Sequence, residues 1–330
     1  MMRIGYFGDG RWAHRSFERI VDSQELEAVY VVARHDKPDP VLREYTRDLE
    51  IPFFSPADVN ESAFLEKLAK YAPDLNVSMS YNQILGADAI ALAPEGFINC
   101  HAGALPFYRG RNVLNWVLIN GEDRFGVTVH YVDESIDTGD IITQRFEVIT
   151  PDDDYQSLLD KAVELCADAL LDALHDIRQG TVSTRSQQEI HPVGFYCSGR
   201  REGDEWIDWS WTTARVHNFI RAIAPPGPGA RTILNGNPVV MIESEKISEA
   251  PEYIDRPGTV VGRDGSGIVV KTGDSTLKVT KIADWNGEIS NPRSPEHRIG
   301  TSFGMNFQHE FRRLSNQIER LEKRIDQLEK

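Results

Sequence analysis

The chain opens on a β-strand pattern that runs directly into a glycine-rich turn and then into a helical pattern. A mostly apolar run at 3–7 precedes the segment Gly8-Asp9-Gly10-Arg11-Trp12-Ala13, and helical spacing continues to Val21. A strand, a tight turn and a helix in this order form the first half of a βαβ unit, and such units build parallel sheets. The opening therefore predicts an α/β fold in which a Rossmann-like, mostly parallel sheet forms the N-terminal domain.

The rest of the first 190 residues continues this alternation of strands and helices. Further strands are predicted at 28–33, 75–79, 96–99 and 126–131. Residues 153–178 carry apolar side chains at three- and four-residue spacing, which predicts a long amphipathic helix packed on the core. The polar connector 180–188 interrupts the pattern, so we place the first domain at 1–190.

Residues 191–300 predict a second domain of a different class. A helix is expected at 212–223, and the break Pro225-Pro226-Gly227-Pro228-Gly229 ends it. Short β-like runs follow at 239–242, 258–261, 267–270 and 277–280, separated by turn residues. This spacing is typical of a small β-rich domain.

Residues 306–330 form a third unit, an amphipathic helix with a heptad pattern. The apolar stripe consists of Phe311, Leu314, Ile318, Leu321, Ile325 and Leu328. Isoleucine at a positions and leucine at d positions favour a parallel two-stranded coiled coil, and Arg324 and Glu329 stand where charges pair across strands. We therefore expect a homodimer joined through this helix. Docking of the stripe onto the chain's own domain is the alternative.

Composition restricts the compartment and the partners. The chain is 40% hydrophobic, and its three cysteines, Cys100, Cys166 and Cys197, suggest no disulfide framework. No apolar run approaches the roughly 20 residues that span a bilayer, and the first residues enter a strand instead of a signal peptide. We expect a cytoplasmic protein with no membrane partner. The formal charge of −15 argues against a nucleic-acid partner, because binding RNA usually requires a basic face.

Three polar residues supply the parts of an acyl-transfer site that needs no nucleophile. Asn99 and His101 end a predicted strand, and Asp137 follows further along the chain. Moving an acyl group to an amine requires a base for the amine proton and a donor for the developing oxyanion. His101 suits the first role and Asn99 the second, while Asp137 fixes the imidazole tautomer. Neighbours on a strand face opposite sides, so Cys100 is expected to point into the protein rather than act as a nucleophile.

The segments around these three residues resemble the formyltransferase family that uses N10-formyltetrahydrofolate. The motifs that carry the resemblance are 104–112, Trp116, 126–130 and 136–140. The resemblance implies direct attack of an amine on the formyl group through a tetrahedral intermediate. In that reaction Asn99 holds the formyl oxygen, His101 handles the amine proton, and Asp137 orients the imidazole and a water.

The resemblance extends to about Gly180, with weaker similarity in the second domain, and it assigns further residues. Binding of the folate is implied for Ser80, Tyr81, Asn82, Gln83, Ile84 and Asp133. No metal is expected, because the nine histidines and three cysteines show no zinc-ligand spacing. His130 lies in an apolar strand and is expected to be a structural histidine.

The acceptor is expected to be a nucleotide-linked amino sugar. Arg109-Gly110-Arg111-Asn112, with Asn115 and Trp116, resembles the branch of the family that formylates UDP- or dTDP-linked amino sugars for cell-surface polysaccharides such as O-antigen. A glycine turn before a helix also attracts anions. We therefore expect the nucleotide sugar to contact Gly8, Gly10, Arg11, Trp12, Arg109, Arg200 and Arg201.

Three other functions stay open from the residues. Methionyl-tRNA formylation is the alternative within the family, and the acidic balance disfavours it. An NADP-dependent oxidoreductase is possible on the glycine turn, since Arg34 ends the second strand where it could meet a 2′-phosphate. A non-catalytic nucleotide-binding scaffold is the third, although it leaves Asn99, His101 and Asp137 without a role.

Overall fold

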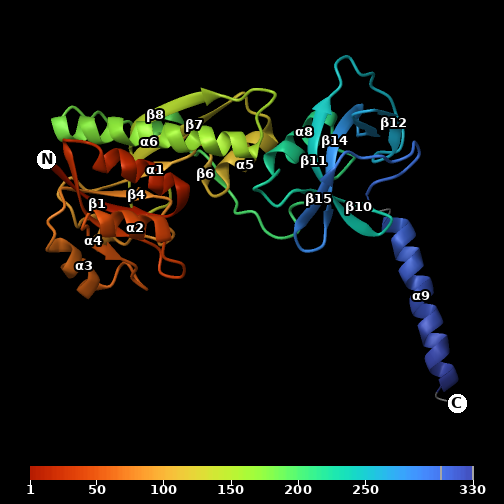
Figure 1. Cartoon of the computed structure of the whole chain (residues 1–330), viewed down its shortest axis with the longest axis horizontal. Helices are drawn as coiled ribbons and strands as arrows, with labels where there is room; N and C mark the ends of the chain where they lie inside the picture. Colours follow the sequence, from red (N-terminus) through yellow and green to blue (C-terminus); the bar gives the residue numbers. More distant parts are fainter. Residues whose placement is uncertain (305–306, 329–330) are drawn as a thin grey trace. The chain divides into compact units, whose positions relative to one another are not determined.

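The computed structural model describes residues 1–304 and 307–328, and contacts divide the chain into two compact units (Figure 1). The N-terminal unit contains Met1–Leu118 and Glu122–Arg200. The C-terminal unit contains Ile119–Gly121 and the chain from Arg201 onward. The main boundary between the two units therefore falls directly after Arg200.

A seven-stranded sheet forms the centre of the N-terminal unit, in the order β3-β2-β1-β4-β5-β7-β8. Its strands are β1 (Met2–Gly8), β2 (Leu26–Val32), β3 (Phe53–Phe54), β4 (Leu75–Met79), β5 (Phe97–His101), β7 (Arg124–Tyr131) and β8 (Ile141–Val148). The pairs from β3 to β5 are parallel, while the pairs β5–β7 and β7–β8 are antiparallel. The predicted Rossmann-like, mostly parallel sheet is confirmed. The sequence pattern does not predict β3, which has two residues, or the half-exposed β8, which lacks a clean alternation.

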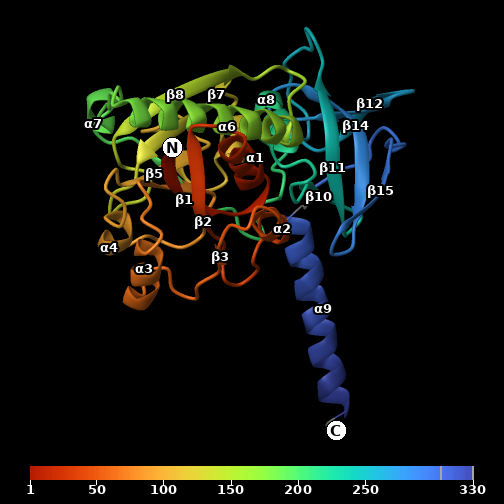
Figure 2. The ribbon, with the colours of Figure 1, turned by 60° about the vertical axis from the view of Figure 1, so that its left-hand side comes forward.

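Helices cover both faces of this sheet (Figure 2). The helices before Arg200 are α1 (Gly10–Val21), α2 (Pro40–Asp48), α3 (Ser62–Ala69), α4 (Ala87–Ile90), α5 (Val113–Asn120), α6 (Tyr155–Gln179) and α7 (Gln187–Ile190). Successive side chains of a strand point to opposite faces, so Tyr6 packs against Phe17 of α1 whereas Phe7 packs against Phe97. Helices α1 and α6 pack together on the face of Tyr6, and Leu68 of α3 belongs to the buried cluster around Phe7.

The long helix α6 has clear local signals at both ends. Asp154 accepts a hydrogen bond from the Ser157 backbone N–H, and the Ser157 hydroxyl accepts one from the Asp154 N–H, which completes a capping box. Gly180 ends the helix in the left-handed conformation, with φ of 68°. Because these signals and the apolar stripe are local, the helix predicted at 153–178 matches the observed one within two residues.

A short pair of strands connects the loop after β5 to the segment that precedes the second unit. Strand β6 (Arg109–Gly110) pairs in parallel with β9 (Tyr196–Cys197). A two-residue pairing leaves no periodic signal in the sequence. It nevertheless fixes the backbone beside the ends of β5 and β7, where the polar residues gather.

An antiparallel six-stranded sheet forms most of the C-terminal unit, which confirms the predicted β-rich domain. The strands are β10 (Ala230–Leu234), β11 (Asn237–Lys246), β12 (Val260–Asp264), β13 (Gly267–Lys271), β14 (Thr276–Trp285) and β15 (Ile289–Arg293). Helix α8 (Thr213–Ala222) packs on β11 and β14. Strands β10 and β15 were not anticipated from the pattern; each pairs along one edge only, with β11 and β14 respectively.

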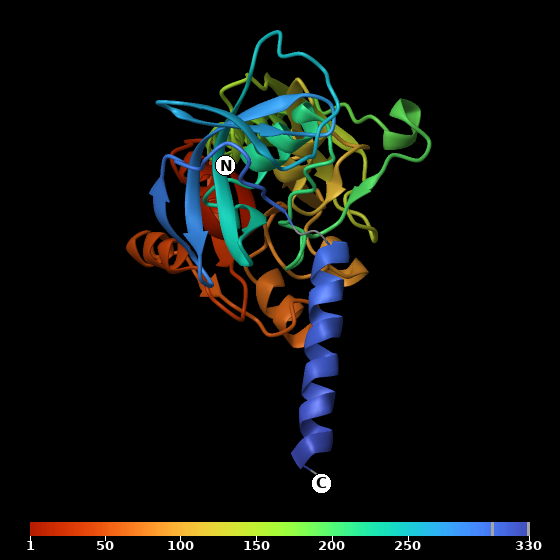
Figure 3. The same cartoon turned by 90° about the vertical axis from the view of Figure 1, so that its right-hand side faces the viewer.

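Helix α9 (Phe307–Leu328) runs without interruption after the β-rich part of the C-terminal unit (Figure 3). The side chains of Leu314, Ile318, Leu321 and Ile325 are each at least 50% exposed. The other two residues of the predicted stripe, Phe311 and Leu328, have side chains that lie outside the described part of the chain. Across the described residues, no helix combines the length and the hydropathy needed to cross a bilayer.

Candidate active site

Strand β5 presents two polar side chains on one face at its end. Asn99 and His101 stand two residues apart, and both line a cavity of about 930 Å³ at the carboxyl edge of the sheet. Cys100, between them, is 5% exposed, and its Sγ lies 3.6 Å from the carbonyl oxygen of Cys166 in α6. The prediction that Cys100 points into the protein is therefore confirmed.

His101 is held by the backbone of the following loop. Its Nε2 lies 2.7 Å from the carbonyl oxygen of Tyr108, and because a carbonyl only accepts, Nε2 carries the proton. Gly103 makes room for this contact, since a Cβ there would lie 2.6 Å from His101 Nε2. Burial lowers the pKa of His101, and the Asp137 charge and the Tyr108 carbonyl only partly oppose it. The ring is thus neutral at pH 7, with the lone pair of Nδ1 available as a base.

Asp137 lies between two imidazoles. Its Oδ2 accepts a hydrogen bond of 2.8 Å from the Gly110 N–H and lies 3.7 Å from Nδ1 of His101, while Oδ1 lies 3.6 Å from Nε2 of His130. Burial alone would raise the pKa of this carboxyl. His130, His101 and the Gly110 amide outweigh burial and lower the pKa to about 2. Asp137 is therefore an anion at neutral pH.

His130 joins this group, and the sequence did not indicate it. Its Nδ1 lies 2.7 Å from the Tyr131 carbonyl oxygen, so Nδ1 carries the proton and Nε2 accepts a hydrogen bond of 3.2 Å from the Asn99 amide. The expected structural role is thus correct in part, because His130 is 2% exposed and bonded to backbone, yet it also lines the cavity. Only the pairing of β5 with β7, which sets Asn99 opposite His130, reveals this.

Two loops form the rest of the cavity wall next to these residues. The loop after β4 contributes Ser80, Tyr81, Asn82, Gln83 and Ile84, and the loop after β7 contributes Asp133. All six residues predicted to bind the folate therefore lie on the same cavity as Asn99, His101 and Asp137. The Gln83 amide anchors its loop, since it accepts from the Val59 N–H and donates to the Pro56 carbonyl.

The glycine turn after β1 is arranged differently from what an anion site would need. Trp12 lines the cavity, but Gly8, Gly10 and Arg11 lie outside its lining. The Gly10 N–H donates to a carboxylate oxygen of Asp39 at 2.9 Å, and Arg11 pairs with Asp160 of α6 at 2.6 Å. The carboxylates of Asp39 and Asp160 thus bind the Gly10 N–H and the Arg11 guanidinium, two groups that were expected to meet a phosphate. The phosphate role of this turn stays a prediction.

The other arginines that were predicted to meet the nucleotide sugar lie in different surroundings. Arg109 is 9% exposed and donates to Gln187 rather than facing the cavity of Asn99 and His101. Arg200 stacks on the ring of Trp116, with 5.9 Å to the centroid. Arg201 belongs to the C-terminal unit, where its N–H donates to Asp204.

Residues that were not assigned to the folate or to the nucleotide sugar also line this cavity. They include Asp9, Arg34, Arg111, Asn112 and Tyr196. The Arg34 guanidinium forms ion pairs with Asp36 at 2.6 Å and Asp9 at 3.3 Å. Within the residues that the structure describes, no three or more His, Cys, Asp or Glu side chains form a metal-binding group.

Comparison with known proteins identifies the family. Residues 2–174 match the profile described as formyl transferase, and residues 201–295 match its C-terminal domain. The chain belongs to the formyl transferase family. It is therefore an enzyme that transfers formyl groups, and the formyl donor of the family is N10-formyltetrahydrofolate. The oxidoreductase alternative is excluded by this assignment.

Proteins that are similar in sequence over most of the chain include two methionyl-tRNA formyltransferases. Methionyl-tRNA formyltransferase of Desulfotalea psychrophila is 31% identical over 289 residues, covering 85% of this chain and 88% of the relative. The enzyme of the same name from Geotalea daltonii is 32% identical over 285 residues, covering 84% and 89%.

Among solved structures, an N-formyltransferase from Helicobacter canadensis in complex with folinic acid and dTDP-3-aminofucose superposes with a TM-score of 0.65. It is 19% identical, and the match covers 84% of this chain and 99% of that one. WlaRD, a sugar 3N-formyl transferase, gives a TM-score of 0.62 at 20% identity, covering 84% and 97%. At these identities the likeness shows a shared fold over the two domains.

Proposed function

We propose that this enzyme transfers the formyl group of N10-formyltetrahydrofolate to the amine of a nucleotide-linked amino sugar, UDP- or dTDP-linked, for a cell-surface polysaccharide of the O-antigen type. The distribution of charge carries the choice of acceptor. The chain has a formal charge of −15, and nearly all of the acidic excess lies before Arg201, in the unit that holds the cavity. Such a surface disfavours a polyanion as large as tRNA.

In the proposed reaction His101 accepts the proton of the attacking amine at Nδ1. The Tyr108 carbonyl holds the proton on Nε2, so Nδ1 is the basic nitrogen, and the low pKa keeps it unprotonated before the reaction. Proton uptake makes an imidazolium 3.7 Å from the Asp137 carboxylate. Asp137 stabilises that cation by its charge and keeps the ring oriented.

Asn99 is the proposed donor to the formyl oxygen. One of its two N–H groups is fixed by His130 Nε2 at 3.2 Å, which leaves the second for the charge that develops on that oxygen. Because the amide is already oriented by a buried histidine, little reorganisation accompanies the reaction. His130 thus acts through Asn99 and not on the substrate.

The residues around the cavity fit a folate. Tyr81, Ile84 and Ile136 offer apolar surface on two loops, and the cavity of about 930 Å³ has the size of a cofactor site. The Tyr81 hydroxyl is buried without a hydrogen-bond partner among the described residues, so a polar ligand group would satisfy it. N10-formyltetrahydrofolate would supply the formyl group, and Ser80, Tyr81, Asn82, Gln83, Ile84 and Asp133 are the residues proposed to hold it.

Arginines near the site are the proposed partners of the nucleotide diphosphate. Arg34 and Arg111 line the cavity together with Trp12. Guanidinium groups suit phosphates because they donate two parallel hydrogen bonds. Arg200, predicted from the sequence, adjoins the cavity residue Gly199, and its N–H donates to Asn112, which also lines the cavity.

The direct test incubates the enzyme with N10-formyltetrahydrofolate and a panel of UDP- and dTDP-linked amino sugars, with methionyl-tRNA in parallel, and reads the products by mass spectrometry. We expect one formyl group on a sugar nucleotide. His101→Ala should abolish this product, whereas Asp140→Asn, an exposed change in the loop of Asp137, should not. Product on methionyl-tRNA alone, or on no sugar nucleotide, would refute the proposed acceptor.

Methionyl-tRNA is the second candidate acceptor, and a specific observation favours it. The sequence relatives at 31% and 32% identity that cover more than four fifths of the chain carry that name. A tRNA acceptor would make activity fall steeply with salt, because phosphate contacts release counterions. A sugar nucleotide makes far fewer phosphate contacts, so its formylation should depend only weakly on salt.

We also propose that two copies of the chain associate through α9. The exposed stripe of Leu314, Ile318, Leu321 and Ile325 has the spacing of a coiled-coil seam, and a second copy would cover it. Ile318→Asp with Ile325→Asp should convert a dimer to a monomer in light scattering. Asn316→Asp with Gln327→Asp, which adds the same two negative charges off the stripe, should leave the dimer intact. A monomeric mass for the unaltered chain would refute the proposal.

A further inference from the structure

One buried glutamine lies beside the catalytic loop in a segment that the sequence indicated only as a connector. Gln187 begins α7 and is 2% exposed. Its amide nitrogen donates to the carbonyl oxygens of Asp137 at 2.9 Å and Gly139 at 2.8 Å. Its amide oxygen accepts from Nε and Nη2 of Arg109 at 3.1 and 2.6 Å. Every hydrogen-bonding atom of this side chain is therefore used in holding other residues.

The loop that Gln187 holds is strained. Asp137 has a φ of 56°, a left-handed conformation that is costly for a residue with a side chain. At Gly139 the backbone lies so close to Tyr131 that a Cβ would be 1.9 Å from its carbonyl oxygen. Such a conformation persists only where neighbouring groups hold it in place. The two hydrogen bonds from Gln187 to the carbonyl oxygens of this loop hold its backbone in that conformation.

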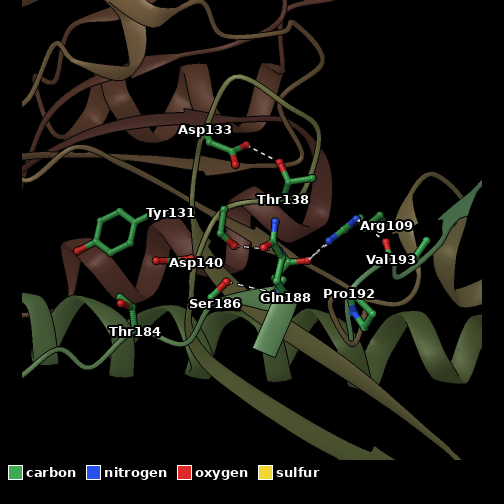
Figure 4. A pocket seen from close by; sticks show the side chains of 12 residues that line it. Arg109, Tyr131, Asp133, Thr138, Asp140, Thr184, Ser186, Gln188, Pro192 and Val193 are labelled. Carbon is green, nitrogen blue, oxygen red and sulfur yellow. Dashed lines mark hydrogen bonds between the residues drawn. The ribbon is translucent and has the colours of Figure 1, made fainter. Parts of the chain in front are cut away.

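Arg109 fixes the glutamine from the other side. Its guanidinium donates to Gln187 and to the Val193 carbonyl oxygen, and it stacks on the Tyr196 ring. Figure 4 shows Arg109 and Val193 on one wall of a second cavity, where Thr138 donates to Asp133. The hydrogen bonds of the buried Arg109 guanidinium are therefore made to residues that lie beside the loop of Asp137.

Two connections thus run from strand β6 to Asp137. The Gly110 N–H donates directly to the carboxylate at 2.8 Å. The preceding residue, Arg109, reaches the Asp137 backbone through Gln187. Together they set both the position of the main chain and the direction of the side chain, and hence the 3.7 Å separation from His101.

We infer that Gln187 is a positioning residue for formyl transfer, which aims the Asp137 carboxylate at His101 by bridging the catalytic loop to Arg109. The inference rests on the role proposed above for Asp137. Gln187 does not touch the reacting atoms. Its loss should lower kcat about 10- to 100-fold, since a misplacement of about 1 Å in a catalytic group costs up to that amount.

The test compares four enzymes: Gln187→Leu, Gln187→Glu, Asp137→Asn and the double variant Gln187→Leu with Asp137→Asn. Gln187→Glu keeps the shape and the pairing with Arg109 but loses both donors to the loop, so it should lose activity as Gln187→Leu does. Gln188→Leu is the control, because Gln188 is the adjacent glutamine and is exposed. It should keep the activity and KM of the wild type.

The double variant separates positioning from general damage. If Gln187 acts through Asp137, the double variant should be within about twofold of Asp137→Asn alone, because the coupled pair is not additive. KM for the formyl donor should change little in Gln187→Glu. Losses that multiply in the double variant, or a Gln187→Glu enzyme with wild-type kcat, would overturn the inference. Full activity of Asp137→Asn would instead reject the proposed role of Asp137.

Discussion

The Asp137→Asn enzyme offers a quantitative test of the site. The substitution keeps the size of the side chain and removes its charge, 3.7 Å from the His101 nitrogen that we propose accepts the proton. Coulomb's law gives about 1 kcal/mol for a unit pair at this separation in water and about 4 kcal/mol at an effective dielectric constant near 20. The imidazolium formed during transfer loses this stabilisation, so kcat should fall by roughly 10- to 1,000-fold.

The same change predicts the direction of a pH shift. Burial lowers the pKa of His101, and the charge of Asp137 raises it in partial opposition. Removing that charge must lower the pKa of His101 further, because the carboxylate is the main group that opposes the effect of burial. His101 then stays unprotonated to lower pH. The acid limb of the kcat profile should therefore move to lower pH while the plateau falls.

The assay is the pH dependence of kcat, measured from about pH 4.5 to 9 at saturating substrates, for wild type, Asp137→Asn and Asp140→Asn. Asp140 is exposed in the same loop, so its variant should reproduce the wild-type profile. An Asp137→Asn enzyme with an unchanged plateau, or with an acid limb moved to higher pH, would contradict the reasoning.

Three further predictions concern the same site. Asn99→Ala should reduce kcat about 100- to 1,000-fold, and a loss below tenfold would show that the amide donates to no developing charge. The lowered pKa of Asp137, about 2 against 3.8, stabilises the fold above about pH 4, and this part is lost as pH falls through about 2. Urea unfolding should therefore show about 2 kcal/mol of acid-sensitive stability that Asp137→Asn lacks, and equal acid dependence of both proteins would exclude this contribution. Gly139→Ala should destabilise by about 1–3 kcal/mol or more, because its Cβ would lie 1.9 Å from the Tyr131 carbonyl oxygen. Gly265→Ala, which has open space, is the control, and equal unfolding midpoints for the two would disprove the clash.

Local sequence predicted the elements whose signals are short-range. The opening strand and α6 follow from apolar periodicity and capping residues, which act over a few residues. The alternation of side chains on β5 likewise placed Asn99 and His101 on one face and Cys100 on the other. The chemistry of acyl transfer pointed to Asp137, the family resemblance added the folate loop, and all of these residues line one cavity.

Partners from distant segments decided the rest. The glycine turn has the sequence of an anion site, yet Asp39 accepts the Gly10 N–H and Asp160 pairs with Arg11. His130 and Gln187 have no local pattern that distinguishes them. Each acquires its position only through strand pairing or through a contact with a loop about 50 residues away, as Gln187 does with Asp137.

The sequence by itself determined the α/β and β-rich units, the polar pair on β5 and the acidic balance of the catalytic unit. Tertiary structure alone decided which nitrogen of His101 is basic, how His130 orients Asn99, and what holds Asp137 in its left-handed conformation. The physical reason is the distance along the chain over which each interaction acts. Periodicity and capping depend on neighbours in the chain, whereas tautomers, depressed pKa values and strained backbone depend on groups that only folding brings together.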